Sequence, residues 1–78
     1  MKPKWEDAPN WANWLACDSN GEWYWYEFEP YTAFSNSSYD SVGYWNVPMG
    51  KHMLASYSDY NIEWEFSLEE RPEEINDK

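Results

Sequence analysis

The pattern of hydrophobic and polar positions is centred on residues 11–29, where large aromatic residues follow one another closely. From Glu22 the sequence reads Glu-Trp-Tyr-Trp-Tyr-Glu-Phe-Glu. Such a run suits a strand with both faces covered better than it suits a helix. Asp18-Ser19-Asn20-Gly21 comes just before it, and Asn and Gly tolerate the left-handed backbone of a tight turn. We therefore predict a β-hairpin formed by residues 11–17 and 22–29.

The position of this turn also predicts the pairing between the two strands. A turn over residues 18–21 pairs Cys17 with Glu22 and Leu15 with Tyr24. On the opposite face, small alanines of the first strand then lie beside large tryptophans of the second, which fills space well.

A helix competes with the first of these strands. Trp11, Trp14 and Leu15 have helical spacing, and Gly21 could end a helix that they begin. The alternation of alanines and tryptophans favours the strand, and a single helical turn at residues 9–13 stays open.

Three later segments are predicted to extend the sheet. Residues 42–47 are typical of a short strand that ends before Pro48, and residues 53–57 form either another strand or a brief helix. In residues 61–68, apolar and polar positions alternate, which predicts a half-buried strand with an acidic outer face. Its apolar positions are Ile62, Trp64, Phe66 and Leu68, and its polar ones are Glu63, Glu65 and Ser67.

The other segments are predicted to lie outside the strands. Residues 1–10 form an extended lead-in that is pinned by Trp5, residues 31–41 form a loop rich in Ser and Asn, and residues 69–78 form a frayed acidic tail. The predicted fold is a single all-β or β-rich domain over residues 1–78. It contains a small antiparallel sheet or a partly closed barrel of four to five strands.

Aromatic bulk compensates for the small size of this domain. A chain of 78 residues buries only ~60% of the surface that it exposes when unfolded, but each aromatic side chain can bury roughly 150–250 Å². The single cysteine, Cys17, cannot form an internal disulfide, which favours a reducing compartment. The sequence shows no apolar run long enough to cross a bilayer and no basic-then-apolar pattern of a leader. We expect a cytosolic protein with no membrane partner.

Charge narrows the classes of partner. The formal net charge is −10, and no Lys or Arg occurs between Trp5 and Gly50. Direct binding of nucleic acid needs clustered cations, so the aromatic residues are not expected to stack on bases. The acidity either keeps the protein soluble or directs it to a basic groove on a partner.

Catalytic and metal-binding motifs are missing from the sequence. Cys17 and His52 are 35 positions apart and lack the spacing of a zinc site, and residues 18–22 form a plain turn rather than a complete calcium loop. Glu27 with Glu29, and the two glutamates of residues 61–68, form solvated faces rather than an acid–base pair in a cleft. We expect no enzymatic activity, no cofactor and no metal.

Two stretches resemble small, mostly uncharacterised proteins of tailed bacteriophages. The first runs from Trp5-Glu6-Asp7-Ala8-Pro9-Asn10-Trp11-Ala12 through Leu15-Ala16, Asp18 and Gly21 to Trp23-Tyr24-Trp25-Tyr26-Glu27, and the second is Ser67-Leu68-Glu69-Glu70-Arg71-Pro72. Residues 31–60 are not covered. The resemblance implies a phage or prophage origin and a host cytoplasm, and it supplies no catalytic residue.

Small acidic phage proteins of this kind are often inhibitors that occupy the nucleic-acid groove of a host enzyme, as antirestriction and anti-CRISPR proteins do. The resemblance thus implies a host protein with a basic surface as the partner. The predicted contact residues are Asp18, Glu22, Tyr24, Trp25, Glu27, Glu29, Glu63 and Glu65. One alternative is a ligand-binding module whose tryptophans stack on a carbohydrate or nucleobase. Another is an assembly accessory that forms a homodimer or larger homo-oligomer.

Overall fold

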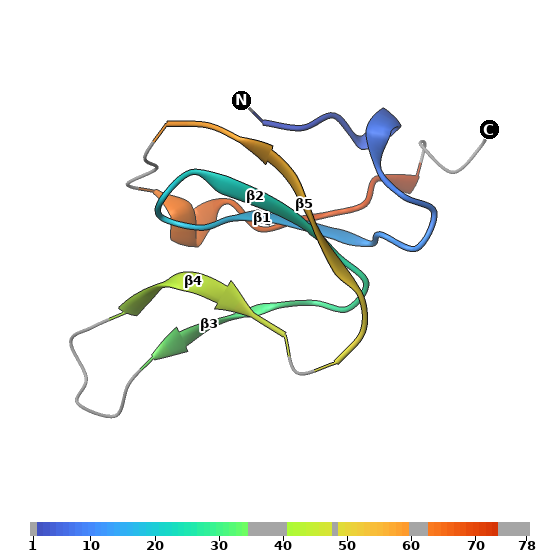
Figure 1. The fold of residues 1–78 in the computed structure, drawn as a ribbon. Helices are drawn as coiled ribbons and strands as arrows, with labels where there is room; N and C mark the ends of the chain where they lie inside the picture. Colours follow the sequence, from blue (N-terminus) through green and yellow to red (C-terminus); the bar gives the residue numbers. More distant parts are fainter. Residues whose placement is uncertain (1, 35–40, 48, 60–62, 74–78) are drawn as a thin grey trace.

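Six short strands and two 3-10 turns make up the computed structural model in Figure 1, which describes residues 2–34, 41–47, 49–59 and 63–73. The elements are η1 (Trp5–Asp7), β1 (Trp14–Cys17), β2 (Glu22–Tyr26), β3 (Tyr31–Phe34), β4 (Ser41–Asn46), β5 (His52–Tyr57), η2 (Trp64–Phe66) and β6 (Glu69–Glu70). No α-helix occurs in these ranges, and no helix there is long and apolar enough to span a membrane.

The strands form two antiparallel sheets. One has four strands in the order β5-β2-β1-β6, and the other pairs β3 with β4. The predicted β-rich fold with a small antiparallel sheet is confirmed, and the sheet is not closed into a barrel.

The opening hairpin is present, but its register differs from the prediction by one residue. Leu15 pairs with Trp25 rather than with Tyr24, and Cys17 pairs with Trp23. The reason lies in the turn, where the amide of Asp18 donates to the carbonyl of Glu22 at 2.9 Å and Gly21 has a φ of 93°. This is a three-residue loop with glycine in the left-handed position, and it places one residue fewer between the strands than the predicted turn.

The one-residue shift decides which side chains share a face. Because side chains alternate along a strand, it moves every β2 residue to the other face relative to β1. We call the side with Leu15, Cys17, Trp23 and Trp25 the closed face, and the side with Ala16, Tyr24 and Tyr26 the open face.

The two faces are covered by different segments. Trp5 of η1 packs on the closed face together with Ala12. Trp45 of β4 and Trp64 of η2 pack on the open face. The expectation that Trp5 pins the lead-in to the body is confirmed, and the predicted helical turn at residues 9–13 is a single turn closed by the amide of Ala12 on the carbonyl of Pro9.

The predicted strand over residues 61–68 is wrong for its described part, residues 63–68. Trp64 is buried as expected, but Phe66 is 85% exposed and its amide donates to the carbonyl of Glu63 at 2.9 Å. A 3-10 turn has three residues per turn, so positions two apart do not point the same way as they would in a strand. Ile62 lies outside the described residues.

Two segments that were predicted to be irregular contain strands. Tyr31–Phe34 is β3, within the predicted loop over residues 31–41, and residues 35–40 lie outside the described part. Glu69–Glu70 is β6, which pairs with β1, so the predicted frayed tail is wrong there. Arg71 extends this attachment, because its amide donates to the carbonyl of Asn13 and its guanidinium to that of Ala12. Residues 74–78 are outside the described part.

The remaining segments agree with the sequence patterns. β4 matches the strand predicted at residues 42–47, and β5 shows that residues 53–57 form a strand and not a helix. β2 is shorter than expected, since it ends at Tyr26 and not just before Pro30.

Candidate functional site

The predicted acidic contact residues lie at two opposite ends of β2. Asp18 lies in the turn that precedes this strand and Glu22 is its first residue, whereas Glu27 and Glu29 follow it. Glu27 also has a local role, because its Oε1 accepts a hydrogen bond from the amide of Lys51 at 3.0 Å. The structure therefore does not bring all of the predicted carboxylates into one patch.

Two further segments join Asp18 and Glu22 at the β1–β2 turn. The hydroxyl of Ser67, just after η2, accepts from the amide of Cys17 at 2.8 Å. The amide of Ser58, just after β5, donates to the carbonyl of Gly21 at 2.7 Å. These contacts hold η2 and the end of β5 beside the turn (Figure 1).

We call the acidic residues that these joined segments carry the acidic end: Asp18, Glu22, Asp59, Glu63 and Glu65. Lys2 forms an ion pair with Glu69, and Lys51 and Arg71 lie over the rings of Trp11 and Trp5.

The two predicted aromatic contact residues differ sharply in exposure. Trp25 is 2% exposed and its ring centroid lies 5.0 Å from that of Trp5, so it belongs to the core and cannot anchor a partner. Tyr24 is its neighbour in the chain, and it is half-buried on the open face. The expectation for Trp25 fails because the register places it on the closed face.

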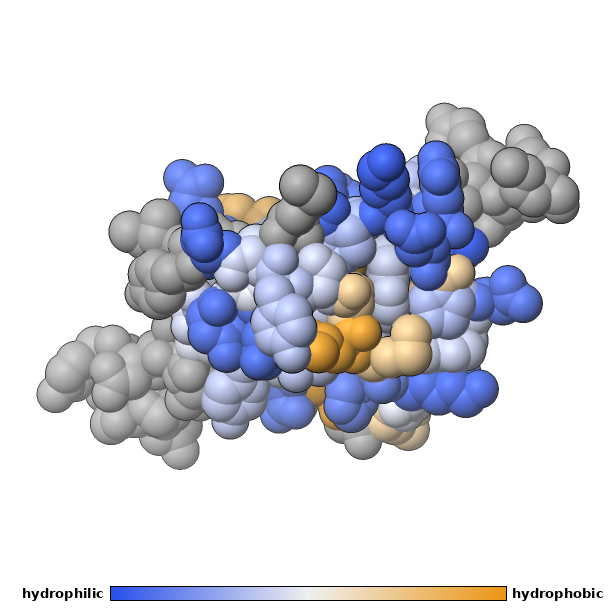
Figure 2. Space-filling view, turned by 45° about the horizontal axis from the view of Figure 1, so that its top comes forward, coloured by the Kyte–Doolittle hydropathy of each residue, from blue (hydrophilic) through white to orange (hydrophobic). Residues whose placement is uncertain are grey.

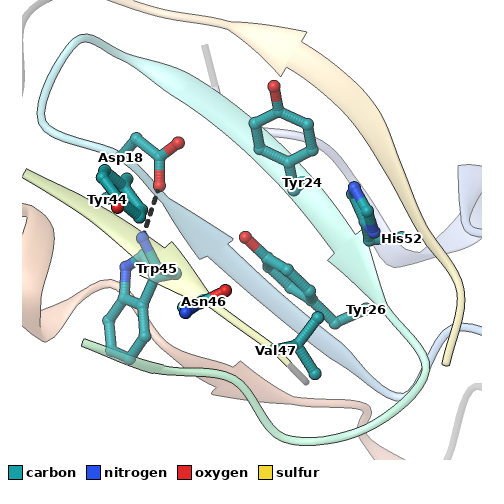
Figure 3. Close-up of a pocket in the computed structure, with 8 residues that line it drawn as sticks. All are labelled: Asp18, Tyr24, Tyr26, Tyr44, Trp45, Asn46, Val47 and His52. Carbon is teal, nitrogen blue, oxygen red and sulfur yellow. Dashed lines mark hydrogen bonds between the residues drawn. The ribbon is translucent and has the colours of Figure 1, made fainter. Parts of the chain in front are cut away.

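A pocket of about 220 Å³ lies between the open face and β4, and Figure 3 shows the side chains around it. Its lining comes from the β1–β2 turn, β2, β4 with the residue that follows, and β5. These residues are Asp18, Tyr24, Tyr26, Tyr44, Trp45, Asn46, Val47 and His52.

Hydrogen bonds to the β1–β2 turn hold β4 against this pocket. The amide of Trp45 donates to Oδ1 of Asp18 at 2.9 Å, drawn as the dashed line in Figure 3. The indole of Trp45 donates to the carbonyl of Cys17 at 3.0 Å, and the amide of Ser19 donates to the carbonyl of Gly43 at 2.9 Å. Asp18 is therefore fixed in place by backbone and does not depend on a flexible side-chain partner.

Three aromatic rings lie side by side in the pocket. The ring centroids of Tyr24 and Tyr26 are 6.2 Å apart, and His52 lies 6.1 Å from Tyr24 and 6.2 Å from Tyr26. Tyr44 of β4 is 47% exposed, whereas Trp45 is buried and meets Trp64 edge-on. The accessible aromatic surface here thus comes from tyrosine and histidine.

Burial and neighbouring charge shift the ionisation of the polar groups in the pocket. Burial raises the pKa of Asp18, the amide of Trp45 opposes this rise, and the nearby Glu22 adds to it. Burial also raises the pKa of Tyr26, and the Asp18 carboxylate raises it further. The pKa of Tyr24 is raised by burial and by the Glu22 carboxylate. The Tyr24 hydroxyl donates a hydrogen bond to Oε1 of Glu22 at 3.1 Å. Both tyrosines stay neutral at pH 7, while Asp18 carries the negative charge.

Sequence reasoning identified Asp18 and Tyr24 but missed most of the pocket. The missed residues are Tyr26, Tyr44, Trp45, Asn46, Val47 and His52. The alternation of Tyr24 and Tyr26 is a signal that they share a face, but nothing local indicates that β4 packs over them. No group of three or more His, Cys, Asp or Glu side chains in the described ranges is arranged to hold a metal ion.

Comparison of the chain with protein-family models, with curated proteins and with solved structures gives no match. The functional assignment therefore depends on the acidic end and on the pocket beside it.

Proposed function

We propose that this protein is a small, non-enzymatic binding protein whose acidic end docks onto a basic surface of a partner protein. The observation that supports this most is that three segments bearing carboxylate side chains, the β1–β2 turn, the end of β5 and η2, are joined by hydrogen bonds at one end of the sheet. In the specific form that the sequence resemblance implies, the partner is a host enzyme that binds nucleic acid, and the protein is a phage-encoded inhibitor of it.

Electrostatics supplies the mechanism. A basic groove responds to the sign and spacing of the charges that approach it, so carboxylates held on a folded scaffold can replace phosphates. The net charge of −10 adds a long-range field that speeds the encounter with a cationic surface. The attachment of η2 and of the β5 end to the turn holds together the backbone segments that carry these carboxylates.

Capture of proteins from a bacterial lysate tests this proposal with three baits. The first bait is the natural chain and the second is Asp59→Lys with Glu65→Lys, at two exposed positions of the acidic end. The third, Glu29→Lys with Glu70→Lys, changes the net charge equally at exposed positions elsewhere. Far-UV circular dichroism checks that all three fold.

The expected result is that the natural chain captures a nucleic-acid-binding protein, and that the acidic-end variant loses it while the charge-matched control keeps it. Capture should also weaken steeply at ~0.5 M salt, because added ions screen exposed charges. Equal loss with both variants would mean that only net charge matters, and equal retention would mean that the acidic end is not the contact surface. Either result contradicts the proposal.

Self-association is the second candidate, and the edge of the larger sheet favours it. Among the described strands, β5 pairs with β2 and lies at the edge of the four-stranded sheet, and its Met53, Leu54 and Tyr57 are exposed. Hydrophilic residues cover most of the face in Figure 2, around a small apolar patch. Light scattering after size exclusion decides between the candidates, since a stable dimer that Leu54→Lys disrupts would support self-association.

A further inference from the structure

We propose that the pocket between the open face and β4 is an aromatic cage that binds one organic cation, either an alkylammonium or a guanidinium group. This inference deepens the proposed function and rests on it in one respect: a Lys or Arg side chain of the basic partner would carry the group. Pocket and acidic end share Asp18, so a side chain that enters the pocket would belong to a partner already docked there.

The first argument comes from the rings. The face of an aromatic ring carries partial negative charge and attracts a cation within about 6 Å of its centroid. Tyr24, Tyr26 and His52 form a triangle with sides of 6.1 to 6.2 Å, and Tyr44 approaches from β4. Figure 3 shows Tyr24 and Tyr26 on one side of the pocket with Asp18 and Tyr44 on the other.

The second argument comes from Asp18. Its carboxylate is half-buried, and it lies near enough to both tyrosines to raise their pKa. One of its oxygens accepts from the amide of Trp45, which fixes its direction but leaves its negative charge without a described cation. A half-buried charge is costly unless an opposite charge pairs with it. A cation in the pocket would supply that charge.

The same lining argues against other ligands. A phosphate or carboxylate would be repelled by Asp18 and by the acidic end around it. Stacking of a sugar or nucleobase on tryptophan, the alternative drawn from the sequence, needs an exposed indole face. Trp45 is buried here and its ring meets Trp64 at 84°. Among the described residues, Trp5, Trp23, Trp25 and Trp64 are buried as well.

NMR titration of the full chain tests the cage with two pairs of probes. Choline is compared with its neutral carbon analogue, 3,3-dimethyl-1-butanol, and N-acetyl-arginine amide with N-acetyl-citrulline amide. We expect choline or the arginine probe to shift the signals of the pocket residues in a saturable way, with the neutral partner of each pair binding roughly tenfold more weakly or worse. Equal binding of the neutral probes would overturn the cage, because an apolar pocket alone would explain it.

Variants locate the binding and control for general charge effects. Asp18→Asn keeps an oxygen that can accept from Trp45, and Tyr44→Ala removes a half-exposed wall. Both should weaken cation binding by roughly tenfold. Asp7→Asn and Tyr31→Ala make the same chemical changes at exposed positions outside both the pocket and the acidic end, and they should change cation binding by less than about twofold. Equal weakening by Asp18→Asn and Asp7→Asn would overturn the proposal in favour of nonspecific attraction.

The two proposals can fail separately. Saturable binding of the small cations together with lysate capture that is insensitive to the acidic-end variant would keep the cage and remove the docking proposal. No cation binding together with capture that depends on the acidic end would do the reverse. If choline binds more tightly than a Lys- or Arg-containing peptide, the natural ligand is a free small molecule. If the peptide binds more tightly, the natural ligand is a side chain of the partner protein.

Discussion

The closed and open faces of the central sheet are built from alternate residues of the same strand, yet they differ in chemistry. Trp23 and Trp25 of β2 point to the closed face, where Trp5 seals them. Tyr24 and Tyr26 point to the open face, which β4 covers only in part. The choice between tryptophan and tyrosine at successive positions thus separates a dry core from a polar pocket.

The polar atoms of the aromatic residues follow the same division. On the closed face, the indole of Trp23 donates to the hydroxyl of Ser58 and that of Trp5 to the carboxylate of Glu69, both at the edges of the core. On the open face, the hydroxyl of Tyr24 donates to Glu22 beside the pocket. Buried indoles need a partner for a single N–H, whereas tyrosine hydroxyls can also accept hydrogen bonds from a ligand.

The largest effect should come from a matched pair of truncations on adjacent residues. Trp25→Ala removes a 2% exposed ring from the closed face and should cost roughly 3–5 kcal/mol, which is close to the whole stability of a domain this small. Tyr24→Ala removes a half-buried ring from the open face and should cost about 1 kcal/mol. Urea unfolding followed by circular dichroism measures both, and equal costs would erase the proposed distinction between the faces.

A smaller effect should follow when one indole hydrogen bond is removed from each face. Trp45→Phe deletes the bond to the carbonyl of Cys17. The Ser67 hydroxyl lies 3.3 Å from that oxygen but donates at the shorter distance of 2.7 Å to the carbonyl of Trp64, so the cost should be about 1 kcal/mol. Trp5→Phe deletes a bond to the Glu69 carboxylate, and its cost should exceed that of Trp45→Phe at neutral pH and shrink as Glu69 is protonated. An NMR titration should also show the pKa of Glu69 rising in Trp5→Phe, and an unchanged pKa would contradict this account.

The smallest effects concern the pH dependence of stability, where the two regions act in opposite directions. Burial alone would raise the pKa of Glu69, but hydrogen bonds from Lys2 and Trp5 outweigh it and hold the pKa below 4.5. The unfolded chain therefore takes up this proton first, and stability from Glu69 is lost as the pH falls through its lowered pKa. Asp18 has a raised pKa, so its contribution is fully present below 3.8 and is lost as the pH rises through the raised value.

Glu69→Gln should accordingly reduce the loss of stability in acid, by less than about 1 kcal/mol because the ion pair with Lys2 is partly exposed. Asp18→Asn should instead remove the decline on the higher-pH side. The free energy of unfolding in urea from about pH 3 to about pH 7 measures both slopes. Each variant is compared with the natural chain. If both substitutions changed the slope of stability against pH in the same direction, the proposed opposition between the two regions would be wrong.

The sequence predicted the parts of the fold that depend on local pattern. The aromatic run around Trp23 and the Asp18–Gly21 turn were sufficient for the opening hairpin, and β4 lies where a strand was predicted. For the segment of β5 the sequence left a strand and a brief helix open, and the structure has the strand. The predicted register was wrong because the left-handed conformation of Gly21 closes a three-residue loop, one residue shorter than the predicted turn. The 3-10 turn around Trp64 was missed because the alternation of apolar and polar residues is also the pattern of a half-buried strand. Only the tertiary packing shows that Trp64 is buried and Phe66 is not.

The candidate site shows the same limit. Asp18 and Tyr24 could be chosen from the sequence because an acidic turn and an aromatic strand are local features. The pocket also needs Tyr44 and His52, which reach it through the packing of β4 over the open face and the pairing of β5 with β2. The local sequence around Tyr44 and His52 contains no pattern that predicts these long-range contacts.

The position of Cys17 has a practical consequence. Its side chain is 0% exposed, at the end of β1 and inside the closed face, and it is the one cysteine in the chain. Thiolates react with alkylating reagents only when a reagent can reach them. The rate at which an alkylating reagent labels Cys17 therefore reports how often β1 opens, and no further cysteine has to be introduced.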